Sequence, residues 1–302
     1  MPASAGPSPA VVAATVGRLD RTSGWRRFGV DVAGGTGTAG PVGWVGLGAM
    51  LGDDRALDAW YAAELGATAA GHRDLAGALI VYRFAGSLAE LVVGTLTDQR
   101  RALPLVPDGV ALRFGDAARI DEVAVAAGSV AVLADDPDAG APGVVPVSAA
   151  RLREVAVVTL VDVFGPLATA VRARAPFGLR GIWGTLADHV AEVAVRRARD
   201  RGGDVDEAWR GASALLDELV ARQPGARARP RRLVVPTARG PQAVVAKGTC
   251  CLIYKAGAPV GDRGAAARRV GRDACTSCPL RPEPDRARRF AAHLDAPGPP
   301  RR

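Results

Sequence analysis

Four cysteines near the C-terminus are the residues whose types and spacing most clearly predict chemistry. They form an adjacent pair, Cys250 and Cys251, and a Cys-x-x-Cys, Cys275 and Cys278, and no cysteine precedes them. A Cys-x-x-Cys turn points two thiolates at one metal. Adjacent residues of a regular strand point to opposite faces, so the backbone at the first pair must kink, and Gly248 is placed to help. Four thiolates in two pairs suit a structural zinc ion or a two-iron cluster with sulfide bridges.

The cellular compartment decides whether these thiols stay reduced. The N-terminus lacks a basic segment followed by an apolar run, so no secretory signal is expected. No stretch of about 18 uncharged apolar residues is present, and the richest run, 155–171, is interrupted by Asp162, Gly165 and Pro166. We therefore expect a cytoplasmic protein without a transmembrane segment. Thiols stay reduced there, which favours metal ligands over disulfides.

Positive charge is concentrated around the cysteines. Residues 221–302 carry 18 basic and 5 acidic side chains, a net charge of +13 (18 − 5), whereas residues 1–150 carry 11 and 16, a net charge of −5 (11 − 16). Such a local field attracts anions. Cations close to a redox centre also favour its more negative, reduced state. The cations near the cysteines in sequence, expected to tune the centre or to contact a substrate or electron donor, are Lys247, Lys255, Arg268, Arg269, Arg272 and Arg281.

The rest of the chain has to position this centre, and its pattern divides into three parts. We expect an irregular N-terminal arm over 1–41, a helical body with a small β hairpin over 42–222, and a cysteine-bearing segment over 223–302. Apolar spacing and N-cap residues predict helices over 56–65, 72–97, 148–174, 181–200, 205–222 and 285–294. Short β-branched runs predict strands within 108–134 and at 233–235 and 243–245. The expected fold class is mainly α with a small β component (α+β).

Two sequence runs resemble the C-terminal signature of the FhuF-like ferric-siderophore reductases: Cys250-Cys251-Leu252-Ile253-Tyr254-Lys255 and Cys275-Thr276-Ser277-Cys278-Pro279-Leu280. Upstream, Ile182-Trp183-Gly184 resembles the family's apolar-Trp-Gly element at a helix start. The resemblance covers residues 42–294 and is most specific around the cysteines. The 23 residues between the two pairs (275 − 251 − 1) exceed the family's usual gap. The stretch from Ala258 to Asp273 therefore resembles an insertion.

The resemblance implies a cofactor and an activity. It implies a 2Fe-2S cluster held by Cys250, Cys251, Cys275 and Cys278, with no catalytic residue beyond the cluster. It further implies that the protein reduces Fe(III) to Fe(II) in a ferric siderophore and so releases the iron. The electrons are then expected from a reduced flavin, a ferredoxin or a reductase protein.

A function of a different class also fits the cysteines: a zinc ion that stabilises a basic module for nucleic-acid binding. The run Arg227-Ala-Arg-Pro-Arg-Arg232 would contact phosphates. Aromatic residues are sparse near it and no recognition helix is evident, so we expect no nucleic-acid partner. The three histidines, His72, His189 and His293, lie far apart in the sequence and do not predict a histidine metal site. We expect His189 to be structural and Trp183 to anchor the core at a helix start.

Overall fold

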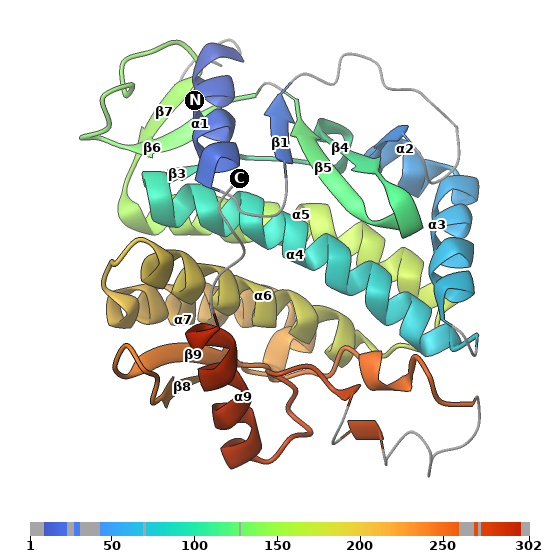
Figure 1. Ribbon diagram of the computed structural model, residues 1–302. Coiled ribbons are helices and arrows are strands. Elements are labelled where there is room, and N and C mark those ends of the chain that lie inside the picture. The colour runs from blue at the N-terminus through green and yellow to red at the C-terminus, as the bar shows by residue number, and fades with distance from the viewer. Residues whose placement is uncertain are drawn as a thin grey trace.

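Helices make up most of the molecule, and short strands form the smaller β part, so the fold is mainly α (α+β) (Figure 1). The computed structural model describes residues 9–22, 27–30, 43–68, 71–126, 128–259, 269–270 and 273–296. Its hydrophobic core reaches from the N-terminal helix to the C-terminal hairpin. The helices are α1 Pro9–Thr22, α2 Leu47–Gly52, α3 Asp54–Ala67, α4 Arg73–Gln99, α5 Ala149–Arg174, α6 Leu179–Asp200, α7 Val205–Arg222 and α9 Glu283–Asp295.

The helices expected from the sequence are confirmed, and side-chain caps begin several of them. The Asp53 carboxylate accepts a hydrogen bond from the backbone of Arg55 at 3.1 Å at the start of α3. Ser148 accepts one from the backbone of Arg151 at 3.2 Å at the start of α5, and Asp204 caps α7 in the same way. Such caps satisfy backbone N–H groups that the first helical turn leaves without a partner.

Short strands form two sheets and a hairpin. The first sheet has the order β1-β5-β4-β2, in which β4 and β5 are the antiparallel hairpin predicted from the sequence, and β1 runs parallel to β5. The second has the order β3-β6-β7, and β8 pairs with β9 in an antiparallel hairpin. The strands are β1 Arg27–Val30, β2 Gly43–Gly46, β3 Arg101–Ala102, β4 Val110–Phe114, β5 Ile120–Val125, β6 Val130–Leu133, β7 Val144–Val147, β8 Arg231–Val235 and β9 Gln242–Ala246.

The N-terminal part corrects the expectation of an irregular arm over residues 1–41. Within the described residues 9–22 and 27–30, α1 and β1 are regular elements. Val12, Val16 and Leu19 of α1 are at most 1% exposed and belong to the hydrophobic core. The Arg101 guanidinium donates to the Thr15 hydroxyl of α1 at 3.0 Å, which ties the helix to β3. This part of the chain is therefore integrated into the fold.

The central helices α4, α5, α6 and α7 lie in two layers, with α4 packed on both α5 and α6 (Figure 1). α4 and α5 are long and apolar enough to cross a membrane by length and composition alone, and 78% and 50% of their most apolar windows are buried. Core helices of soluble proteins meet the same criterion. α5 runs unbroken through Pro166, as the helix predicted over 148–174 requires. The absence of a transmembrane segment stays a prediction.

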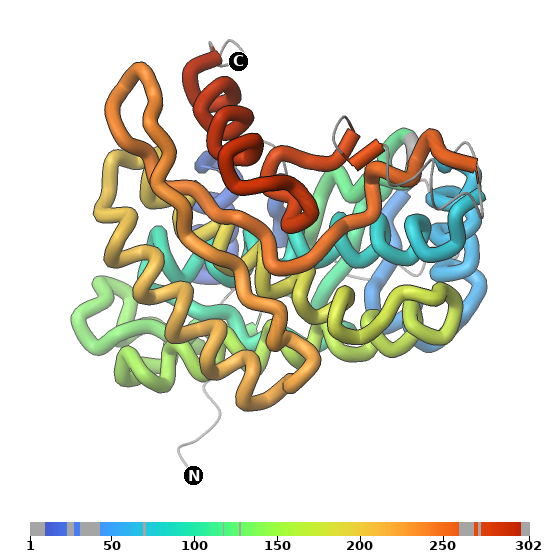
Figure 2. The backbone as a smooth tube through the Cα atoms, turned by 90° about the horizontal axis from the view of Figure 1, so that it is seen from below, coloured from blue at the N-terminus to red at the C-terminus, as the bar shows by residue number. Residues whose placement is uncertain are grey.

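The C-terminal segment lies across the outer side of α6 and α7 (Figures 1 and 2). Its β8–β9 hairpin packs against α6 through β9, and α9 packs against β8. Between them the chain passes through a single turn of 3-10 helix, Ile253–Lys255. Val245 of β9 is part of the same core as the central helices. The body and this segment thus meet along α6, and the four cysteines lie at that boundary.

Candidate metal centre

The four cysteines converge from two places in the C-terminal segment. Cys250 and Cys251 follow β9, and Cys275 and Cys278 lie in the turn before α9. The Sγ atoms of Cys250 and Cys278 are 4.0 Å apart, and those of Cys251 and Cys275 are also 4.0 Å apart. Each pair therefore combines one cysteine from each motif. All four are free thiols, and Cys251 and Cys278 are buried whereas the other two are partly exposed.

The contacts between the sulfur atoms shift the pKa values of all four thiols. The contact with Cys278 lowers the pKa of Cys250, whereas the contacts with Cys250 and Cys275 raise the pKa of Cys278. Cys251 donates to Cys275, which raises the pKa of Cys251 and lowers that of Cys275. A bound cation would displace the protons that the thiols hold.

The donor set is compatible with one metal ion or with two. No three His, Cys, Asp or Glu side chains converge closely enough to hold a single ion, as far as the described residues extend. A structural zinc site needs four ligands around one ion. A 2Fe-2S centre takes four thiolates distributed over two irons. The two Sγ–Sγ separations of 4.0 Å fit either arrangement, because two thiolates that share one tetrahedral ion lie about 3.8 Å apart.

The kink expected at Cys250 and Cys251 is present, and Leu252 carries it. Leu252 has φ 59° and ψ 5°, in the left-handed region that non-glycine residues seldom occupy. The chain leaves the strand direction after β9 and turns through Leu252 into the 3-10 helix. Gly248 has a different role from the one expected, because it permits close packing. A Cβ atom at Gly248 would lie 2.5 Å from the Arg229 carbonyl oxygen.

A buried carboxylate of α6 holds the backbone that leads into the first cysteine pair. Asp188 is 1% exposed. Its two oxygens accept hydrogen bonds from the backbone of Gly248 at 2.7 Å and of Thr249 at 3.0 Å, and the Thr249 hydroxyl donates to it as well. Burial raises the pKa of Asp188 to about 7, although these hydrogen bonds act in the opposite direction. The carboxylate thus fixes the residues immediately before Cys250.

The Trp-Gly element of α6 explains how the helix and this loop approach each other. A Cβ atom at Gly184 would clash with the Thr249 side chain and would lie 3.0 Å from the Cβ atom of Ala228. Glycine therefore leaves the space that Thr249 occupies. The neighbouring Trp183 is 5% exposed and packs edge-on against Phe164, with ring centroids 5.1 Å apart. The expectation that Trp183 anchors the core is confirmed.

The Cys-x-x-Cys turn is held by its own backbone and by Arg281. The backbone N–H of Cys278 donates to the Cys275 carbonyl at 3.1 Å, and that of Lys247 donates to the Ser277 carbonyl at 3.1 Å. The Arg281 guanidinium donates to the carbonyls of Ala274 and Cys275, the latter at 3.0 Å. Arg281 is only 3% exposed. This corrects its expected role, because Arg281 stabilises the turn and offers no surface for a substrate or donor.

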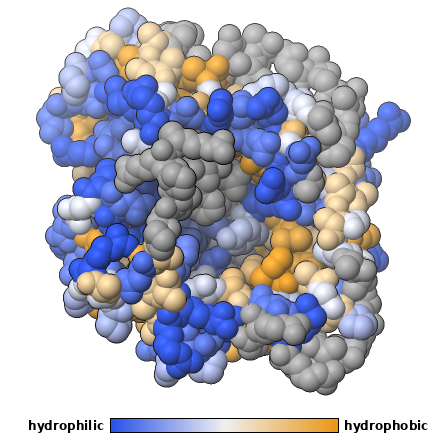
Figure 3. Space-filling model, in the orientation of Figure 1, coloured by the Kyte–Doolittle hydropathy of each residue, from blue (hydrophilic) through white to orange (hydrophobic). Residues whose placement is uncertain are grey.

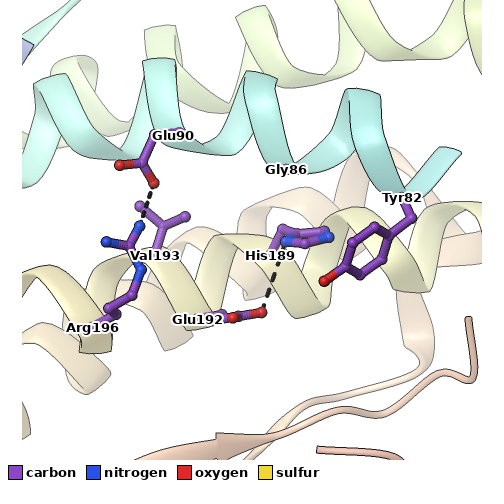
Figure 4. Close-up of a pocket in the computed structure, with 7 residues that line it drawn as sticks. All are labelled: Tyr82, Gly86, Glu90, His189, Glu192, Val193 and Arg196. Atoms are coloured by element: carbon purple, nitrogen blue, oxygen red, sulfur yellow. Dashed lines mark hydrogen bonds and ion pairs between the residues drawn. The ribbon is translucent and has the colours of Figure 1, made fainter. Parts of the chain in front are cut away.

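Lys247 is a buried cation beside the cysteines. Its Nζ atom lies 4.4 Å from the centroid of the Tyr82 ring and 3.9 Å from Oε2 of Glu192. Burial alone would lower the pKa of Lys247, but Glu192, Tyr82 and the nearby thiolates outweigh it and raise the pKa. Glu192 also lies 3.8 Å from Nδ1 of His189, whose ring meets Tyr82 edge-on between α4 and α6 (Figure 4). A positive charge therefore stays next to Cys251 and Cys275.

The other cations expected at the site are distributed differently. Lys255 forms an ion pair with Asp74 at the start of α4, so it ties the cysteine loop to the body. Arg269 pairs with Asp273 at 2.8 Å. Arg268 and Arg272 lie outside the described residues.

A cavity of about 170 Å³ lies next to the Cys-x-x-Cys turn, between α6, β9 and α9. Ser277 forms part of its wall, and the Ser277 hydroxyl lies 3.9 Å from Sγ of Cys275. Glu192 and Arg196 line both this cavity and a smaller one between α4 and α6, which Figure 4 shows. The sequence did not indicate either cavity, because residues from separate elements form both.

Neither a known protein family nor a curated protein matches this chain. The site therefore has to be interpreted from its own residues. Of these, the four cysteines and Lys247 were expected from the sequence. Asp188 and the supporting role of Arg281 were not. The one sequence signal for Asp188 is an acidic residue within the otherwise apolar run Leu186-Ala187-Asp188-His189-Val190 of a helix.

Proposed function

We propose that the protein is a cytoplasmic iron–sulfur oxidoreductase that reduces the Fe(III) of a ferric siderophore to Fe(II) with a 2Fe-2S cluster. The observation that supports it most is the pairing of the cysteines. Cys250 lies 4.0 Å from Cys278 and Cys251 lies 4.0 Å from Cys275. The four cysteines would bind one cluster, with one pair on each iron.

A single electron is sufficient for the proposed reaction. Siderophore oxygens are hard anions, which bind Fe(III) far more tightly than the larger and less charged Fe(II). A bound 2Fe-2S cluster would supply one electron at a time, at a potential set by charge, hydrogen bonds and exposure. A reduced flavin, a ferredoxin or a reductase protein would return that electron.

The chain's own residues would hold and tune the centre. Asp188 and Arg281 fix the backbones of the two cysteine motifs. The buried ammonium of Lys247 favours the more negative, reduced state, because it lies in a part of the molecule with little solvent screening. Cys250 and Cys275 are partly exposed, which suits exchange of electrons with a partner at the surface.

The zinc-stabilised nucleic-acid module is the competing possibility. Its basic run would need free guanidinium groups to contact phosphates. Arg229 instead pairs with Asp217 at 2.8 Å, Arg232 pairs with Asp206, and Arg231 lies 3.5 Å from Glu283. These ion pairs weigh against the nucleic-acid function.

Anaerobic purification of the full chain tests the proposal. We expect a red-brown protein with two irons and two sulfides per chain, and with an electron paramagnetic resonance signal after reduction. Cys275→Ser should lose both the visible absorbance and the reduction of ferric siderophores, whereas Thr276→Ser in the same turn should keep both. A colourless protein containing one zinc ion would refute the proposal and favour the competing one.

A further inference from the structure

The cavity between α6, β9 and α9 is the feature closest to the cysteines that the proposed function leaves without a role. Its volume is about 170 Å³. Pockets that enclose a whole drug-sized ligand measure about 300–1,000 Å³, so this one has room for a single ring-sized group. Ser277 separates it from Sγ of Cys275, 3.9 Å from the serine hydroxyl. A group in the cavity would therefore lie one side chain away from the proposed cluster.

The lining of the cavity favours a ring that is both flat and negatively charged. Apolar side chains, among them Val244 and Phe290, form part of the wall. Two guanidinium groups, Arg196 and Arg199, face one carboxylate, Glu192. That carboxylate already has two cationic or polar neighbours, Lys247 Nζ at 3.9 Å and His189 Nδ1 at 3.8 Å. Lys247 and His189 thus offset the negative charge of Glu192. The two guanidinium groups then favour a ligand with negative charge.

Arg199 is the more available of the two guanidinium groups. Its described partners are the carboxylate of Asp200 at 3.5 Å and the carbonyl of Ala243 at 3.4 Å, both long contacts. A guanidinium has five N–H donors, so most of its capacity remains for an anionic oxygen. Arginine also stacks on aromatic rings, and Phe290 offers a further edge or face to such a ring. Arg196, by contrast, forms an ion pair with Glu90 of α4.

We propose that this cavity binds one catecholate arm of the ferric siderophore, an aromatic ring with two anionic oxygens. The inference rests on the proposed function and adds to it a substrate class and a place. A cluster held by the four cysteines would supply one electron to the bound Fe(III), which would become Fe(II). The catecholate oxygens keep the electron pairs of the Fe–O bonds and take up protons from water as the complex dissociates. A reduced flavin or ferredoxin then re-reduces the protein.

Redox-inert gallium(III) complexes separate binding from electron transfer. Isothermal titration of the full chain with gallium(III) tris(catecholate) should show binding, and the neutral gallium(III) tris(acetohydroxamate) should bind more weakly. Arg199→Gln should weaken the binding of the catecholate complex about tenfold, which corresponds to one lost charge-assisted hydrogen bond. Arg210→Gln removes the same charge from the exposed side of α7 and should change nothing. Equal affinity in the two variants would overturn the proposal.

A second variant keeps the test decisive if Arg199→Gln does not fold. Phe290→Trp retains every charge and fills part of the cavity, so it should abolish binding of the catecholate complex while the visible absorbance stays unchanged. Unaltered binding in Phe290→Trp would place the ligand elsewhere, for example on a donor-protein surface, and would refute the catecholate site. A colourless protein that still binds the gallium complex would refute the cluster and leave this site standing.

Discussion

At the scale of single residues, Asp188 is the group on which the cysteine geometry most depends. It is a buried carboxyl group whose oxygens accept hydrogen bonds from the backbone just before Cys250. Asp188→Asn replaces one acceptor oxygen by an N–H donor, which then faces backbone N–H groups of the loop. Leaving such buried donors without acceptors costs about 1–3 kcal/mol each. We expect the free energy of unfolding to fall by about 2–3 kcal/mol, with a parallel loss of the iron of the proposed cluster.

The matched control for this prediction is Asp217→Asn. Asp217 lies on α7, is 70% exposed and pairs with Arg229. Exposed pairs contribute at most about 1 kcal/mol, so the urea midpoint and the iron content should stay close to those of the wild type. If Asp188→Asn retains full iron content and stability, Asp188 does not organise the loop.

The candidate metal ligands could be predicted from the sequence better than the residues that hold them in place. Cysteines are scarce, and their spacing follows from ligand geometry, so the four thiols stood out. The sequence gives the charge of Arg281 and not its burial, so the support that it provides to the turn could not be predicted. In the structure it donates to carbonyls of the turn. Asp188 lies 62 residues before Cys250 (250 − 188), and only the packing of α6 on the loop brings them together.

At the scale of elements, the approach of α6 to the cysteine loop predicts opposite effects of two glycine substitutions. A Cβ atom at Gly184 would clash with Thr249, whereas one at Gly211 in α7 would meet nothing within 4 Å. Gly184→Ala should destabilise the protein by about 1–3 kcal/mol, since the loop has to move. Gly211→Ala should stabilise it by roughly 0.5–1 kcal/mol through helix propensity. Thermal unfolding of both variants tests this, and a stabilised Gly184→Ala would contradict the close packing.

The contact between α3 and α4 predicts a pH dependence of stability. Glu64 is 0% exposed, pairs with Arg83 at 2.9 Å and accepts a hydrogen bond from Trp60. Burial raises the pKa of Glu64 from 4.5 to about 7, against the lowering effect of both partners. Between these two values the folded state binds a proton that the unfolded state has released. The contribution of Glu64 to the free energy of unfolding is therefore fully present below pH 4.5. It is lost as the pH rises through about 7.

Glu64→Gln isolates that contribution, because glutamine stays neutral at every pH. From pH 4.5 to pH 8, the free energy of unfolding of the wild type should fall by roughly 2–3 kcal/mol relative to that of the variant. Urea unfolding at a series of pH values measures it. A difference that stays constant over this range would mean that Glu64 titrates normally.

The helices were predictable because apolar spacing and caps are local signals. Part of the β structure was not, because β1, β2, β3 and β7 lie outside the predicted strands. The hairpin of β4 and β5 joins neighbours in sequence, but β1 pairs with β5 over a separation of about 95 residues, as Arg27 opposite Glu122 shows. β3 has only two residues, too few to give a periodic pattern. The same long-range pairing hid β1. α1 does carry a local signal, Val12, Val16 and Leu19 at helical spacing, so its place in the fold could have been predicted.

At the scale of the whole molecule, the uneven charge of the chain is partly neutralised by folding. The face in Figure 3 is mostly hydrophilic, with smaller hydrophobic patches. The basic C-terminal segment meets acidic groups of the body: Lys247 with Glu192, Lys255 with Asp74, and Arg232 with Asp206. These pairs, together with the apolar contact of β9 and α6, join the segment to the body. Some of the positive charge in residues 221–302 thus forms ion pairs that hold the segment on the body.

This attachment predicts that residues 223–296 unfold together with the helical body and not as a separate domain. Val244 and Val245 of β9 are 2% and 6% exposed against α6. Native-state hydrogen exchange should therefore show backbone amides of β9 protected to within about 1–2 kcal/mol of those in α6, since cooperative units open together. The turn between β8 and β9, in which Ala238 and Arg239 are exposed, should exchange faster and serves as the internal reference. If β8, β9 and α9 exchanged together at low free energy while α4 and α6 stayed protected, the segment would be an independent unit, and the cysteine site would assemble by docking of two domains.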